Sequence, residues 1–87
     1  MQKLAVVGLG YVGIPLACKF ADAGFDVLGI DIALEKVKNI RIGELPLTGN
    51  EPGLSKLLQK VVKTGKLKVT TEISKCKDSD AIFICVE

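Results

Sequence analysis

The sequence predicts an α/β fold built on a parallel sheet, and three observations carry that prediction. Short apolar segments alternate along the chain with segments whose apolar residues recur at helical spacing. The apolar segments show little alternation with polar residues, as expected of strands covered on both faces. The 87 residues are 48% hydrophobic, which excludes a disordered chain and suits one compact unit.

The first half of the chain is predicted to hold two strands, each followed by a helix. The run 4–7 is an apolar strand that ends at a glycine, and residues 12–23 have apolar side chains at helical spacing. Gly24 suits the left-handed position after that helix, because glycine has no Cβ to clash there. A second strand is expected over 27–30 and a second helix over 34–41.

A loop over residues 44–53 separates this half from a third predicted helix. The loop contains two prolines and two glycines, which are frequent in turns. Asn50 or Glu51 is expected to cap the helix, with Pro52 in its first turn, where a missing N–H costs little. The helix is expected to end at Gly65.

The remaining residues predict two more strands and complete the fold. The segment 67–71 is the expected third strand and the wholly apolar run 81–86 the fourth. The polar stretch 72–79 is expected to hold at most one helical turn. Helices on both faces and right-handed crossovers are expected for such a chain. The prediction is therefore a Rossmann-like three-layer fold with parallel strand order 3-2-1-4, truncated within one mononucleotide-binding half.

Three glycines between the first strand and the first helix indicate a dinucleotide-binding loop. Gly8, Gly10 and Gly13 stand in GLGYVG. Gly8 permits a tight turn, Gly10 lets a pyrophosphate approach the backbone, and Gly13 lets the helix pack closely on the strand. The helix is expected to begin near Tyr11, with its positive dipole end facing the loop and Pro15 tolerated in its first turn. The alternative is a tight turn that binds nothing.

Asp31 strengthens this interpretation because it ends the second strand, 18 residues after Gly13. A carboxylate there accepts both ribose hydroxyls of an adenosine and repels a 2′-phosphate, so NAD is expected over NADP. FAD stays open, although flavoproteins usually carry Glu at this position. The alternative role for Asp31 is a helix cap near Ala33.

Composition limits the other classes of function. A net charge of +2 does not by itself indicate nucleic acid, and the seven lysines within 56–77 are best explained as a solvated surface. No apolar run approaches the ~20 residues of a membrane span, and three cysteines are poor material for a disulfide framework. A cytoplasmic protein without catalytic residues of its own is expected, and its apolar excess predicts self-association.

Four segments resemble the amino-terminal domain of the UDP-glucose/GDP-mannose dehydrogenase family: GLGYVGIPLA, GIDIALEKV, EPGLSKLL and TTEISKCKDSDAIFICV. The resemblance covers essentially all of residues 1–87, and these motifs together are far more specific than the glycines alone. The spacing in GELPLTGNEPGL is more similar to the UDP-N-acetylmannosamine branch than to typical UDP-glucose enzymes.

The resemblance implies an NAD-dependent oxidation of the C6 alcohol of a UDP-sugar to a carboxylate. It places the pyrophosphate on the Gly8–Gly13 loop, which includes Tyr11 and Val12, and on Ile14. It places Asp31 and Lys36 at the adenosine ribose, although Lys36 also suits a solvated helix surface. Val86 begins the family's V-x-T-P segment at the nicotinamide, but Glu87 follows it here.

The same resemblance implies that the family's catalytic cysteine, lysine and sugar-binding residues lie in later domains. The chain is therefore expected to be a partial NAD-binding domain that is inactive by itself and meets a UDP-sugar only with those domains. A regulatory NAD-sensing module without catalysis is the alternative, and the added EPGL helix argues against it. A 6-phosphogluconate-type dehydrogenase fits less well, because Tyr11 and Val12 do not match its GLGxMG motif.

Overall fold

A computed structural model gives the fold of residues 2–47 and 52–85. Four parallel strands form one sheet in the order β3-β2-β1-β4, which confirms the predicted fold and strand order. The strands are β1 (Lys3–Val7), β2 (Asp26–Ile30), β3 (Leu67–Thr70) and β4 (Ala81–Ile84). The helices are α1 (Gly13–Asp22), α2 (Leu34–Arg41), α3 (Leu54–Lys63) and the 3₁₀ helix η1 (Ile73–Asp78).

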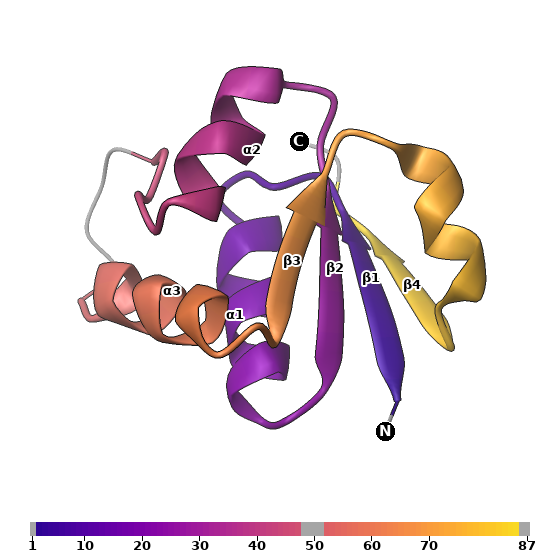
Figure 1. Ribbon diagram of the computed structural model, residues 1–87, viewed down its shortest axis with the longest axis horizontal. Coiled ribbons are helices and arrows are strands. Elements are labelled where there is room, and N and C mark those ends of the chain that lie inside the picture. The colour runs from indigo at the N-terminus through magenta and orange to yellow at the C-terminus, as the bar shows by residue number, and fades with distance from the viewer. Residues whose placement is uncertain (1, 48–51, 86–87) are drawn as a thin grey trace.

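The helices are divided unequally between the two sides of the sheet. Figure 1 shows α1, α2 and α3 on one side of the strands and η1 on the other. The strand order explains this division, since the chain steps along the sheet from β1 to β3 and then returns past β1 to reach β4. With one handedness of crossover, the return connection must lie on the opposite side. The second layer is thus supplied by η1 within residues 2–47 and 52–85.

The core lies between the sheet and α1, α2 and α3. Ala17 and Cys18 of α1 are fully buried, as are Val37 of α2 and Leu58 of α3. Ala17 lies one turn after Gly13 on the buried face of α1. Burial of this apolar face is the main force that holds the three helices on the strands.

Several boundaries differ from the sequence predictions for local reasons. The polar stretch before β4 was expected to hold at most one helical turn, but η1 spans six residues, about two turns of 3₁₀ helix. Pro52 precedes α3 instead of lying in its first turn, because Gly53 adopts the left-handed conformation (φ 81°) and the helix begins at Leu54. The proposed caps Asn50 and Glu51 lie outside the described residues.

The two edges of the sheet are protected differently. At the β3 edge, Arg41 donates from Nε and Nη2 to the carbonyl oxygen of Val69, at 3.3 and 3.0 Å. At the β4 edge, three successive apolar side chains are exposed: Ile82, Phe83 and Ile84. A charged side chain at a sheet edge disfavours pairing with a strand of another molecule, as at β3, whereas an apolar edge such as β4 favours such pairing.

Within residues 2–47 and 52–85, no helix is both long and apolar enough to cross a bilayer.

Candidate functional site

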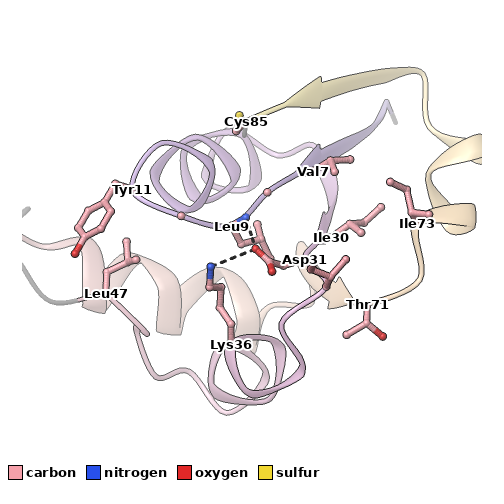
Figure 2. Close-up of a pocket in the computed structure, with 13 residues that line it drawn as sticks. Val7, Leu9, Tyr11, Ile30, Asp31, Lys36, Leu47, Thr71, Ile73 and Cys85 are labelled. Atoms are coloured by element: carbon pink, nitrogen blue, oxygen red, sulfur yellow. Dashed lines mark hydrogen bonds and ion pairs between the residues drawn. The ribbon is translucent and has the colours of Figure 1, made fainter. Parts of the chain in front are cut away.

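A cavity of about 490 Å³ opens at the carboxyl ends of the strands. The glycine loop and the last residues of β1 and β2 form its floor (Figure 2). Tyr11 and Leu47 lie at one end of it, and Thr71 and Ile73 lie at the other. Ligands of open parallel sheets bind in this place, where the connections leave the sheet in opposite directions.

The glycine loop has the geometry that its sequence predicts at two of its three glycines. Gly8 adopts φ 96°, and its N–H donates to the carbonyl of Ile30 at 2.8 Å, so the chain turns sharply where β1 ends. Gly13 leaves no room for a side chain, because a Cβ there would lie 1.7 Å from the Gly8 carbonyl oxygen. Gly10 lines the cavity, and its contact with a pyrophosphate stays a prediction.

Asp31 joins three parts of the site. Its Oδ2 accepts from the N–H of Leu9 at 2.9 Å and from Nζ of Lys36 at 3.3 Å. Its Oδ1 accepts from the N–H of Ala33 at 2.9 Å. The carboxylate therefore holds the chain that enters α2 but does not cap the helix, because the N-cap is Ala33 and α2 has no side-chain cap hydrogen bond. It also faces the cavity with the glycine loop.

The pKa of the Asp31 carboxyl reflects these contacts. Burial by itself would raise the pKa, since the charged form loses water. The hydrogen bonds from the N–H groups of Ala33 and Leu9 and the contact with Lys36 outweigh burial, and together they lower the pKa below its ordinary value. The group is therefore an anion at neutral pH and an acceptor for hydroxyl donors.

Lys36 is not a fully solvated lysine. Its side chain is 30% exposed and pairs with Asp31 across the mouth of the cavity (Figure 2). Among the described residues that line the cavity, Lys36 is the one cation and Asp31 the one anion.

The remaining predicted site residues are placed less directly. Tyr11 lines the cavity and Val12 is exposed at the start of α1. The Ile14 side chain is buried in the core, and its N–H donates to the Gly10 carbonyl at 3.1 Å. The part that Ile14 takes in phosphate binding stays a prediction, and Val86 lies outside the described residues.

Sequence reasoning missed several lining residues. Thr71 follows β3 and Cys85 follows β4, so both reach the cavity from the carboxyl ends of their strands. Parallel pairing could have indicated them, because it brings all those ends to one edge of the sheet. Leu9 was also missed, and its N–H is the loop's link to Asp31.

The chain matches the model of the NAD-binding domain of the UDP-glucose/GDP-mannose dehydrogenase family over residues 2–87. The chain belongs to this family. Its fold and its cofactor, NAD, follow from that membership. The glycine loop, the adjoining carboxylate and the cavity suit such a domain.

Several named dehydrogenases resemble the chain over about a fifth of their own length. The UDP-N-acetyl-D-mannosamine dehydrogenase of Pyrococcus horikoshii is 42% identical over 86 residues, which cover 99% of this chain and 20% of that protein. A structure of GDP-mannose dehydrogenase from Pseudomonas aeruginosa aligns with TM-score 0.90 and 41% identity, over 100% of this chain and 20% of that one. The structure of a UDP-glucose dehydrogenase from Pyrobaculum islandicum aligns with TM-score 0.90 and 36% identity. The alignment covers 99% of this chain and 20% of that one.

Proposed function

We propose that this domain binds NAD with the pyrophosphate on the Gly8–Gly13 loop and the adenosine ribose at Asp31 and Lys36. One observation carries the proposal: the Asp31 carboxylate lies 2.9 Å from a backbone N–H of the glycine loop and faces the same cavity. A diphosphate on the loop and a ribose at the acid are thus within reach of one molecule.

The residues of the glycine loop and α1 suit a bound NAD. The α1 cap is Val12, and α1 has no side-chain cap hydrogen bond. The N–H groups of Ile14 and Leu16 in the first turn donate to the carbonyls of Gly10 and Val12, so α1 would act on a bound anion through the positive end of its dipole. The overlap that a Cβ would make at Gly13 shows how closely helix and loop approach. When bound, NAD supplies a hydride acceptor, while these residues hold its adenosine and diphosphate.

The first test is titration with NAD and NADP. We expect NAD to bind more tightly than NADP, because Asp31 repels the 2′-phosphate of NADP. Asp31→Ala is expected to narrow this difference in affinity between the two coenzymes. Asp31→Ala also removes the acceptor of the Leu9 N–H, so Asp31→Asn, which keeps one carbonyl oxygen, is the matched variant. Equal binding of NAD and NADP by the unchanged chain would contradict the role of Asp31.

The placement of the pyrophosphate has its own test. Gly10→Val puts a branched side chain at the loop surface that lines the cavity. We expect NAD binding to be lost while the circular dichroism spectrum and the urea unfolding curve stay close to those of the unchanged chain. Affinity that survives this substitution would show that the pyrophosphate lies elsewhere.

The reaction that this domain serves is proposed to be oxidation of the C6 alcohol of a UDP-sugar, of the UDP-N-acetylmannosamine or UDP-glucose type, to a carboxylate. The support is the activity named for similar proteins, among them the dehydrogenases of Pyrococcus horikoshii and Pyrobaculum islandicum. The chain spans about a fifth of their length. We expect these 87 residues to catalyse nothing alone and to meet a UDP-sugar only beside further domains.

Turnover tests this expectation directly. NADH formation is measured with UDP-N-acetylmannosamine and with UDP-glucose, with the Pyrococcus horikoshii enzyme as positive control. Any NADH formed by the 87-residue chain would contradict its proposed inactivity. A regulatory module that senses NAD without catalysis stays the alternative, and a cytoplasmic location stays a prediction.

Self-association of the 87-residue chain is proposed to occur through β4. Ile82, Phe83 and Ile84 are 46, 36 and 71% exposed on this edge strand. Light scattering is expected to show species larger than a monomer, reduced by Ile84→Lys. Ile42→Lys is the control, because Ile42 is also 71% exposed but lies after α2. A monodisperse monomer of the unchanged chain would contradict the proposal.

A further inference from the structure

Leu9 connects the glycine loop to the core. It stands between Gly8 and Gly10, and its side chain is 1% exposed within the core cluster. The side chains that follow it in the loop, Tyr11 and Val12, are 58 and 59% exposed. The Leu9 side chain is therefore directed inward, while its N–H donates to Asp31 at 2.9 Å (Figure 2).

Gly29 makes the space that Leu9 occupies. It lies in β2, opposite Val6 of β1 and Val69 of β3. A Cβ at Gly29 would lie 3.0 and 3.1 Å from Cδ2 and Cδ1 of Leu9, and 3.1 Å from Cγ1 of Val69. These distances are tighter than nine in ten real Cβ contacts, so a methyl group there would require its neighbours to move by a few tenths of an ångström.

Backbone conformation does not explain this glycine. Positive φ angles occur at Gly8, Gly24, Gly43, Gly53 and Gly65, and Gly29 has none. Glycine within a strand weakens the strand, and a common reason for it is the close approach of another group. Here the approaching group is the Leu9 side chain.

We propose that Gly29 is a positioning residue for NAD, which acts by seating Leu9 and so fixing the glycine loop. Gly29 is absent from the residues that line the cavity. Because the core is close-packed, a methyl group at position 29 shifts Leu9 by a few tenths of an ångström. Leu9 is flanked by two loop glycines, and its N–H bonds Asp31, so the shift reaches both proposed contact regions of NAD.

This inference rests on the proposed placement of the pyrophosphate, and its test is separable from that of the placement. Gly29→Ala is expected to weaken NAD binding by roughly fivefold, the effect of losing about one neutral hydrogen bond. Leu9→Val removes both Cδ atoms from the contact, so the Gly29→Ala/Leu9→Val pair is expected to recover NAD affinity to within about twofold of Leu9→Val alone.

The matched control relieves the other crowded neighbour. Gly29→Ala/Val69→Ala makes room beside Val69 but leaves Leu9 displaced, so it is expected to bind NAD as weakly as Gly29→Ala alone. Urea unfolding of each variant separates stability from affinity. If Gly29→Ala acts through general packing, adding either Leu9→Val or Val69→Ala restores NAD affinity. If it acts by positioning the loop, only Leu9→Val restores it.

A second readout follows the loop itself. The exchange rate of the residue 9 amide hydrogen is expected to rise in Gly29→Ala and to fall again with Leu9→Val, because this N–H bonds Asp31. If Gly29→Ala does not fold, the Gly29→Ala/Leu9→Val pair decides, since a folded pair that fails to bind NAD overturns the proposal.

Two other results would also overturn it: full NAD affinity in Gly29→Ala, or equal rescue by Val69→Ala. If Gly10→Val also leaves NAD affinity unchanged, the placement of the pyrophosphate has failed. If Gly10→Val abolishes binding and Gly29→Ala has no effect, only the role of Gly29 has failed.

Discussion

Replacing Gly13 by alanine sets two effects of opposite sign against each other. Alanine favours a helix over glycine by at most about 1 kcal/mol, so helix propensity predicts a more stable protein. The structure predicts the reverse, because the new Cβ would lie 1.7 Å from the Gly8 carbonyl oxygen and 2.8 Å from its carbon. Both atoms are backbone, so no flexible side chain can yield.

The size of the overlap decides which effect is larger. The methyl group and the oxygen must separate by about 1.3 Å to reach 3.0 Å, the distance below which real Cβ contacts do not occur. Overpacking of this kind costs about 3 kcal/mol, which leaves a net loss of about 2 kcal/mol. A chain of this size has roughly 4–13 kcal/mol of stability in all. We therefore expect the urea midpoint to fall by about 1–2 M.

The assay is urea unfolding followed by circular dichroism, with NAD titration of the folded variant. Gly24→Ala is the control, because Gly24 has φ 103° but no atom outside its chain neighbours lies within 4 Å of the position that a Cβ would take. Gly24→Ala should lose about 1 kcal/mol through backbone strain alone and keep its affinity for NAD. A Gly13→Ala protein as stable as the unchanged chain, with NAD affinity intact, would refute the close approach of α1 to Gly8.

Three further predictions concern charged groups. Contacts lower the pKa of Asp31 in the folded chain, so its contribution to stability is complete above about pH 4 and is lost as pH falls through the lowered value. When the free energy of unfolding in urea is plotted against pH, Asp31→Asn should flatten the curve in this acidic range. An unchanged slope there would contradict the prediction. Lys36→Met should widen the preference for NAD over NADP by a few-fold, about 1 kcal/mol, because one positive charge near a 2′-phosphate is lost. Lys38 lies outside the cavity lining, so Lys38→Met should leave the ratio of NAD affinity to NADP affinity unchanged in paired titrations. Arg41→Met should cost about 1 kcal/mol in urea unfolding and speed amide exchange in β3, because the Val69 carbonyl loses its donor; equal stability would argue against the contact.

Much of the fold could be predicted because its signals are local. Apolar runs and helical spacing lie within a few residues of each other, and Asp31 is fixed to the site by its place at the end of a strand. The strand order followed from the alternation of strands and helices and from the handedness of crossovers. Gly13 was predicted to allow close packing, and the overlap with Gly8 confirms it.

Contacts between distant segments were harder to foresee. The burial of Leu9 depends on Gly29, 20 residues away, and a pattern of glycines treats the residue between them as unspecified. The isolated glycine in the apolar run of β2 was the available signal, since it indicates that another group approaches closely. The extent of η1 and the contact of Arg41 with Val69 depend on tertiary packing, which short-range periodicity does not contain.

The three hydrogen bonds to Asp31 have a consequence for the thermodynamics of coenzyme capture. They tie the glycine loop and the entry to α2 together before any ligand arrives. Preorganisation of this kind reduces the conformational entropy that association must otherwise remove. If the adenosine ribose binds at Asp31 as proposed, these two segments need little further ordering on binding.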